Sequence, residues 1–167
     1  LELYSSSAIL VDVQNGTVLA EKGMDEKIYP ASMTKLMTLL VAAENLPDLD
    51  ATFTMTQAII DPLYLAGASM AGYVNGETVT MRDLLYGAVV PSGAEATEAL
   101  AQAVAGSEEA FVAMMNEKAR TLGMKDSSFA NPNGLDDERH YSTARDMAKL
   151  AQAALKNETL MRIASTR

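Results

Sequence analysis

The chain opens with a hydrophobic pattern that predicts two short strands. Residues 7–13 and 17–22 are rich in β-branched and aliphatic side chains, and the pair Asn15-Gly16 stands between them. Asn-Gly readily adopts the positive φ angles that a tight hairpin turn requires. A β-hairpin is therefore expected within the first 22 residues.

A mostly apolar segment follows at residues 31–45, "ASMTKLMTLLVAAEN". Pro30 stands where a helix tolerates a missing N–H, and Pro47 lies just beyond the segment. We expect a helix over residues 31–45. Since it has almost no polar face, we also expect it to be buried on most sides, with Lys35 as the one cation in it.

Residues 46–80 carry a mixed pattern. "ATFTMTQAII" fits a strand or a helix, and "GASMAGYVNGET" fits a loop or a hairpin. Beyond them, residues 80–90 and 94–106 are predicted as two short helices, interrupted by Pro-Ser-Gly at residues 91–93. Such a junction is expected to expose Ser92.

The C-terminal half is predicted as helices joined by a longer loop. Ser107 can cap a helix that stops at Gly123, residues 131–142 form a loop, and Thr143 with Asp146 has capping-box spacing before the last helix. The pattern is thus two strands followed mostly by helix. Because an isolated hairpin is too small to stand alone, it must pack on helices or pair with further strands.

Composition narrows the class of protein. The 167 residues are 49% hydrophobic, enough for a substantial core in one domain or two closely packed lobes. A net charge of -9 without a basic cluster argues against nucleic-acid and anionic-membrane partners. The absence of cysteine excludes disulfides, thiolate metal sites and a cysteine nucleophile.

Two observations concern membranes and export. No apolar run approaches the roughly 18 residues needed to span a bilayer. No signal peptide is expected at Leu1, and because exported proteins lose that segment, the chain fits a mature or trimmed form.

Ser32 and Lys35 are the candidate catalytic pair. Residues three apart lie on one face of a helix, so the hydroxyl and the amine can meet. Burial would disfavour the ammonium and turn Lys35 into a base, and the Ser32 N–H at the helix start could stabilise an oxyanion. Ser-x-x-Lys arises by chance about once in a chain of this length, so the apolar context of Lys35 carries the inference.

The segment "PASMTKLMT" closely resembles the nucleophile motif of the penicillin-recognising serine enzymes. The match is to the low-molecular-mass D-alanyl-D-alanine carboxypeptidases, whose usual form is Pro-Ala-Ser-x-Thr-Lys-x-Met-Thr. Four more segments resemble consecutive parts of those enzymes: "SAILVDVQNGTVLAEKG", "VNGETVTMRDLLYGAVVPSG", "AGSEEAFVAMMNEKARTLGMKDSSFANPNGL" and "HYSTARDMAKLAQAAL". The resemblance covers nearly the whole chain.

The resemblance implies an α+β fold of the β-lactamase/DD-peptidase type. In it an antiparallel sheet, of which only the N-terminal hairpin is expected here, packs against a mainly helical subdomain. Residues 1–167 then form a C-terminally incomplete catalytic domain. Residues 1–45 hold the hairpin and nucleophile helix, and residues 46–167 hold the mainly helical region.

The resemblance also implies a reaction. Ser32 attacks the bond between the two terminal D-alanines of a peptidoglycan pentapeptide, forms an acyl-enzyme and releases D-alanine, after which water hydrolyses the ester. Lys35 acts as general base, Ser92 as proton relay and Gly93 as a substrate-binding residue. β-Lactams become covalent inhibitors, no metal or cofactor is needed, and the location is the cell envelope, secreted or membrane-anchored.

The sequence departs from the family pattern at two points. Ala94 occupies the usual asparagine position of the second motif, and neighbouring Glu95 is not an obvious replacement, because its side chain would point away from that of Ala94. The third motif, Lys-Thr-Gly or Lys-Ser-Gly, occurs nowhere. We therefore expect an N-terminal fragment or clipped product. It should be catalytically incomplete unless another polypeptide, such as a missing C-terminal portion, supplies the rest.

Three alternatives remain open. A Ser-His-Asp hydrolase would need His140, the only histidine, with Asp136 or Asp137, but a loop histidine is more often solvated. A serine β-lactamase shares Ser-x-x-Lys but lacks a recognisable glutamate motif for deacylation. A catalytically deficient, penicillin-binding-like protein that binds peptidoglycan is favoured by Ala94 and the missing third motif.

Overall fold

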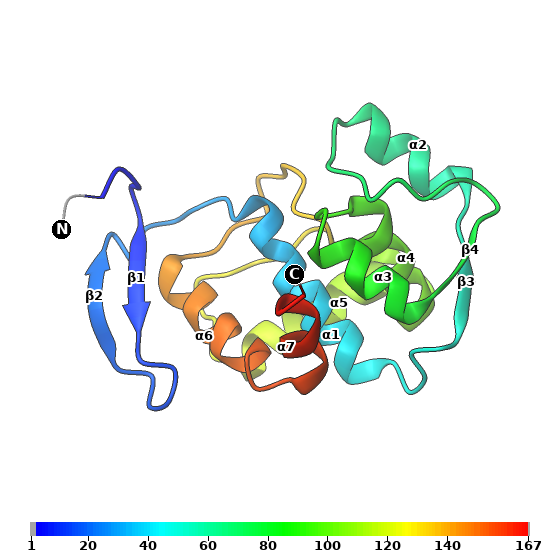
Figure 1. Cartoon of the computed structure of the whole chain (residues 1–167). Coiled ribbons are helices and arrows are strands. Elements are labelled where there is room, and N and C mark those ends of the chain that lie inside the picture. Colours follow the sequence, from blue (N-terminus) through cyan, green and yellow to red (C-terminus); the bar gives the residue numbers. More distant parts are fainter. Residues whose placement is uncertain (1–2, 167) are drawn as a thin grey trace.

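A computed structural model describes residues 3–166 of the chain. Figure 1 shows a helical body with a hairpin at one end and a smaller lobe, residues 52–80, at the other. Small antiparallel sheets beside many helices confirm the expected α+β class. Residues 1, 2 and 167 of the expected domain lie outside the described range.

The N-terminal strands are β1 (Ala8–Val11) and β2 (Val18–Lys22), which pair antiparallel. The predicted hairpin is confirmed, with β1 shorter than its pattern. Asp12 holds the turn by accepting a hydrogen bond from the Asn15 side-chain amide at 3.1 Å, and Gly16 takes a φ of 75°. Every residue of β2 is exposed, so the hairpin contacts the body mainly through β1.

The apolar segment 31–45 forms a one-turn 3-10 helix, η1 (Ala31–Thr34), followed directly by α1 (Lys35–Asn45). The predicted helix is correct in extent, but its first turn is tighter than an α-helix. The Met33 N–H bonds to the Pro30 carbonyl at 3.0 Å, which is the i to i+3 bond of a 3-10 turn. Most of α1 is buried, as its apolar pattern predicts.

The segment that the sequence leaves open contains β3 (Thr52–Thr54), α2 (Gln57–Leu65) and β4 (Thr78–Thr80). β3 and β4 pair antiparallel in a sheet separate from the hairpin. The stretch 51–60, which the sequence leaves open between strand and helix, contains β3 and the start of α2. Strands of three residues are too short for an alternating pattern to identify.

The rest of the body consists of α3 (Met81–Val89), α4 (Ala94–Ala105), α5 (Glu108–Thr121), α6 (Ala144–Ala154) and α7 (Glu158–Ala164). The sequence predicts all but α7 close to these bounds. The predicted cap at Ser107 is confirmed, since its hydroxyl accepts the Ala110 N–H at 3.2 Å. α7 is too short to show helical periodicity.

The capping box predicted before α6 is half formed. The Thr143 hydroxyl accepts the Asp146 N–H at 3.1 Å, as expected. The Asp146 carboxylate turns away from the cap and bonds to the Asp126 N–H, the Ser127 hydroxyl and the Lys149 amine. It therefore ties the loop before α6 to the helix.

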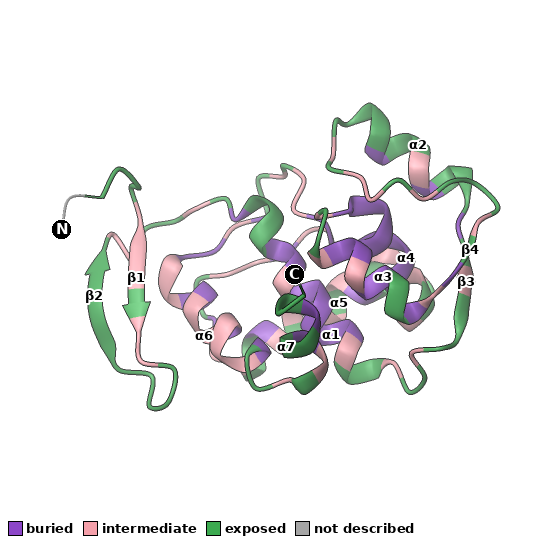
Figure 2. Cartoon of the chain, in the orientation of Figure 1, coloured by how far each residue is buried: buried purple, intermediate pink, exposed green. Residues whose placement is uncertain are grey.

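Helix α1 is the centre of the core. It contacts α3, α4, α5, α6 and α7, and Figure 2 shows buried residues concentrated on α1, α3 and α4. The largest fully buried apolar side chains include Met37, Leu40, Leu84, Leu85, Leu100, Phe111, Met115 and Leu150. Since each contributes about 1.5–3 kcal/mol, this packing fixes α1 and the residues at its start.

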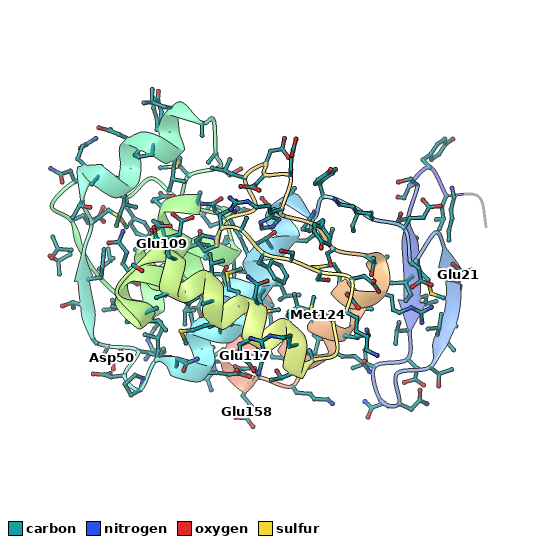
Figure 3. All side chains as sticks on the ribbon, turned by 180° about the vertical axis from the view of Figure 1, so that it is seen from behind. Glu21, Asp50, Glu109, Glu117, Met124 and Glu158 are labelled. Carbon is teal, nitrogen blue, oxygen red and sulfur yellow. The ribbon has the colours of Figure 1, made fainter. Side chains whose placement is uncertain are left out.

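The surface is acidic over several elements. Figure 3 labels Glu21 on β2, Asp50 before β3, Glu109 and Glu117 on α5, and Glu158 on α7, so acidic side chains occur on several elements. Among the described residues, no helix combines the length and apolar character that crossing a bilayer demands.

Candidate active site

Ser32 and Lys35 meet at the junction of η1 and α1. Lys35 Nζ donates a hydrogen bond to Ser32 Oγ at 3.0 Å, across the three-residue spacing that places both on one helix face. Ser32 is exposed, whereas Lys35 is only 5% exposed. The pair therefore presents a hydroxyl to solvent with a buried amine behind it.

Burial governs the protonation of Lys35. Desolvation penalises the ammonium and lowers the pKa of Lys35 below its ordinary value, while the negative charge of Glu95 partly opposes the shift. A lowered pKa increases the fraction of neutral amine at a given pH. The neutral amine has the lone pair that a general base needs.

A loop at residues 131–135 provides the second partner of Lys35. The Asn133 carbonyl accepts a hydrogen bond from Lys35 Nζ at 2.9 Å, and the Pro132 carbonyl accepts one from the Thr38 hydroxyl at 2.6 Å. The loop between α5 and α6 thus runs beside the start of α1 (Figure 1). The sequence predicts a loop here but not this contact, because a backbone acceptor has no residue-type signature.

Gly134 allows that loop to approach the residue before Ser32. Its φ is 88°, and a Cβ at this position would lie 1.9 Å from the Ala31 carbonyl oxygen. Asn131 closes the turn by accepting the Gly134 N–H at 2.7 Å. The Asn-Pro-Asn-Gly stretch is the one sequence signal of a constrained loop here.

His140 lies in the interior, which corrects the expectation of a solvated loop histidine. It is 2% exposed, and its Nδ1 accepts the Ala130 N–H at 3.1 Å. Nε2 is therefore left to donate its proton to Thr34 Oγ1 at 2.6 Å. Burial lowers the pKa of His140, against the charge of Asp137. The neutral ring thus links the loop to η1.

These contacts contradict the Ser-His-Asp alternative. Both ring nitrogens of His140 are engaged away from Ser32. The Arg139 guanidinium binds the Asp137 carboxylate at 2.7 and 3.0 Å, and these hydrogen bonds lower the pKa of Asp137 to about 2. Asp136 is exposed on the same loop. No triad geometry results.

Ser92 lies in the turn between α3 and α4. It is half-buried rather than fully exposed, which corrects the sequence-based expectation. Next to it, Gly93 packs so closely that a Cβ would lie 2.7 Å from the Cβ of Ala71. The hydrogen bonds of Lys35 go to other partners, so a proton relay through Ser92 stays a prediction.

Two strained backbone positions belong to this region. Among the described residues, Ala31 and Ser92 are the non-glycine residues with positive φ, at 47° and 60°. A left-handed conformation costs a side-chain-bearing residue about 1–2 kcal/mol. Such strain persists only where the surroundings enforce it, and it gathers at functional sites. One of these residues precedes Ser32, and the other is a predicted site residue.

The position after the Ser92 turn has no side-chain amide. Ala94 begins α4, is 1% exposed and donates its N–H to the Ser69 carbonyl at 2.8 Å. Glu95 does not replace the amide, because its carboxylate accepts the Gly72 N–H at 2.8 Å. Among the described residues, no three His, Cys, Asp or Glu side chains gather as a metal site.

Comparison with known proteins covers the whole chain. Residues 1–167 match peptidase family S11, described as D-alanyl-D-alanine carboxypeptidase. Two curated relatives are 40% identical: D-alanyl-D-alanine carboxypeptidase DacF of Bacillus subtilis over 97% of this chain, and DacC of Escherichia coli over 88%. The chain spans 42% and 38% of these relatives' lengths.

Solved structures agree with the sequence match. The crystal structure of the Streptomyces K15 DD-transpeptidase superposes with a TM-score of 0.95 at 32% identity, covering 100% of this chain and 66% of that one. D-alanyl-D-alanine carboxypeptidase DacD of Francisella tularensis gives 0.90 at 33% identity, covering 98% and 40%. The chain therefore belongs to the S11 family of D-alanyl-D-alanine carboxypeptidases, as its motifs indicate.

Proposed function

We propose that the full-length protein is a serine-type D-alanyl-D-alanine carboxypeptidase that removes the terminal D-alanine from peptidoglycan stem peptides. The observation that supports this most directly is the 3.0 Å hydrogen bond between the buried Lys35 amine and the exposed Ser32 hydroxyl. Family membership supports the reaction class. Because the chain spans about two fifths of its curated relatives, the activity is proposed for the full-length protein.

In the first step, neutral Lys35 takes the Ser32 proton as Oγ attacks the carbonyl carbon between the two D-alanines. The hydrogen bond to the Asn133 carbonyl orients the amine, and in its neutral form a lone pair takes the place of the N–H that the ammonium donates to Ser32. The Ser32 N–H lies in the first turn of η1, where helix donors lack internal partners. It can therefore stabilise the developing oxyanion.

In the second step, the C–N bond breaks and an ester remains on Ser32. Ser92 passes a proton to the departing amine of D-alanine, and Gly93 contributes to substrate binding. Water then attacks the ester, Lys35 or Ser92 takes the proton, and free Ser32 is restored. Ala94 supplies no amide to this sequence of steps, so substrate orientation depends on the remaining contacts.

We further propose that polypeptide outside residues 1–167 completes the site with the Lys-Thr-Gly motif. Residues 1–45 and 46–167 then act together as one catalytic domain. Two features support a strand docking beside the hairpin. Among the described strands, β1 has one edge without a strand partner, and an apolar groove of about 400 Å³ lies between β1 and α6, lined by residues such as Ile9, Met147 and Leu155.

The substrate class determines the proposed location and inhibitors. Peptidoglycan lies outside the cytoplasm, so we place the protein in the cell envelope, secreted or membrane-anchored. β-Lactams mimic the terminal D-alanyl-D-alanine and are expected to acylate Ser32. No nucleic-acid partner is proposed, since the acidic surface would repel phosphates.

The proposal is tested on the full-length protein with a pentapeptide ending in D-Ala-D-Ala and with a labelled penicillin. We expect release of one D-alanine per peptide and a stable covalent label. Ser32→Ala should lose both, with the fold checked by circular dichroism.

The two remaining alternatives give different outcomes. Rapid hydrolysis of the bound penicillin without D-alanine release would indicate a serine β-lactamase. Peptidoglycan binding with neither labelling nor D-alanine release would indicate a catalytically deficient binding protein. Either result would refute the carboxypeptidase proposal.

A further inference from the structure

The carboxylate of Glu95 is buried beside the Ser92 turn without a role in the mechanism above. It is the second residue of α4 and is 0% exposed. Oε1 accepts the backbone N–H groups of Gly72 at 2.8 Å and Tyr73 at 3.4 Å. Oε2 is buried without a hydrogen-bond partner among the described residues. Such a group is costly to bury, so its position calls for a reason.

The helix itself reduces that cost. The N-terminal turn of α4 carries partial positive charge from its unpaired N–H groups, which favours an anion at this position. The two accepted backbone hydrogen bonds satisfy one oxygen.

Glu95 anchors residues 69–73 over the turn that carries Ser92. This segment is also tied at both ends to the helices on either side of the turn. The Ser69 carbonyl accepts the N–H of Ala94, at the start of α4, at 2.8 Å, and the Tyr73 hydroxyl donates to the carbonyl of Asp83, in α3, at 2.7 Å. Between these ties, the Glu95 carboxylate holds the backbone at Gly72 and Tyr73. Loss of this anchor would free the segment that packs on Gly93.

The negative charge of Glu95 favours the ammonium of Lys35, and so works against the lowering of the Lys35 pKa by burial.

Other charged groups on the helices around α1 are engaged elsewhere or lie outside. Those in ion pairs or caps are Glu44 with Lys118, Arg82 with Asp50, Glu117 with Arg120, Arg145 with Asp25, Asp146 with Lys149, and Asp83 with Thr80. Glu98 is buried on α4 and accepts a hydrogen bond from Gln102, and the remaining groups, on α5 and α7, are Glu108, Glu109, Glu158 and Arg162.

We propose that Glu95 is a positioning residue of this site, which anchors segment 69–73 over the Ser92 turn. The proposal rests on the function proposed above, because it assigns Glu95 a role through Ser92. It goes further by adding a residue outside the three sequence motifs. The consequence to measure is the rate of acylation.

The test measures acylation of the full-length protein by a labelled penicillin across a pH range, for the wild type, Glu95→Gln, Glu95→Asp and Glu95→Ala. Acylation requires neutral Lys35, so the rate rises with pH to a plateau. Glu95→Gln keeps an oxygen that can accept the Gly72 and Tyr73 N–H groups, so its plateau should stay within a few-fold of the wild type. Glu95→Asp has a shorter side chain and should have a reduced plateau.

Glu95→Ala removes both the anchor and the charge. Its plateau should fall by about 10–100-fold, as for a small displacement of a catalytic group. Glu98→Gln is the matched control, since Glu98 lies three residues further along α4 and bonds to Gln102 rather than to segment 69–73. It should keep the wild-type plateau and midpoint.

The outcomes separate this proposal from the proposed function. If Glu95→Ala keeps the wild-type plateau in a folded protein, or Glu95→Gln loses as much of the plateau as Glu95→Ala, Glu95 has no such role. If the wild type itself is not labelled, the proposed function fails instead. Thermal unfolding of each variant shows whether a lost rate reflects a lost fold.

Discussion

At the scale of single residues, the site depends on an amine held in an apolar surrounding. Lys35 exchanges hydration for two hydrogen bonds, to Ser32 and to the Asn133 carbonyl. A buried ammonium with only these partners is less stable than one in water, so burial shifts the protonation equilibrium of Lys35 toward the neutral amine. The same burial that makes Lys35 a base therefore destabilises the folded state whenever the amine is charged.

This coupling predicts a pH-dependent stability. The folded-state pKa of Lys35 lies below that of the unfolded chain, so the unfolded chain binds the proton more tightly. The free-energy cost of burying the charged Lys35 amine is greatest at low pH, and it decreases as the pH rises toward the ordinary pKa of 10.5. Compared with Lys35→Met, the wild type should gain stability as the pH increases. Urea unfolding of both proteins from about pH 6 to about pH 10 measures this, and a constant difference would contradict it.

At the scale of elements, the loop of residues 131–135 must press against the start of η1 for Lys35 to be oriented. Gly134 makes this approach possible, because any side chain there would meet the Ala31 carbonyl. The loop is therefore part of the site although none of its side chains is expected to react.

Gly134→Ala tests the close approach. The clash should displace the loop, destabilise the fold by about 2–4 kcal/mol and slow penicillin labelling. Gly106→Ala is the control, since Gly106 also has a positive φ, of 81°, but a methyl group added there would meet nothing within 4 Å. It should cost only about 1 kcal/mol and leave labelling unchanged. Equal effects of the two substitutions would show that the approach is unimportant.

A second element-scale prediction concerns the cavity of about 310 Å³ between α2, α4 and the loop, which Glu98 lines. Burial, with help from the charge of Glu108, raises the pKa of Glu98 to about 7. The folded state then binds the proton more tightly than the unfolded chain, so stability falls as the pH rises from about 4.5 through about 7.

Glu98→Gln removes this dependence. Relative to the variant, the wild type should lose on the order of 2 kcal/mol of stability between about pH 4 and about pH 8. Chemical denaturation at the two pH values provides the measurement. Parallel stability curves for the two proteins would show that Glu98 is not perturbed.

The sequence is informative where a pattern is long or a motif specific. The hairpin, α1 and α3 to α6 follow from periodicity and capping residues, and the pairing of Ser32 with Lys35 follows from helical spacing. β3, β4 and α7 escape prediction because short elements carry too few positions. The buried state of His140 escapes it because that state depends on Thr34 and Ala130, far away in sequence.

At the scale of the whole molecule, the packing of the helices fixes the positions of Ser32 and Lys35. α1 is held by packing on five other helices, and the loop of residues 131–135 approaches its N-terminal end. The hairpin contacts the helical body mainly through β1, and its second strand, β2, is exposed. This arrangement leaves room beside β1 for the polypeptide that we propose completes the sheet.

The central claim is that Ser32 is the nucleophile and Lys35 its base. The most direct measurement is mass spectrometry of the full-length protein after reaction with a penicillin, followed by mapping of the modified peptide. The account predicts one adduct, on Ser32, which Ser32→Ala abolishes and Lys35→Met forms at least about 100-fold more slowly. An adduct on another residue, or undiminished labelling of a folded Lys35→Met variant, would contradict it.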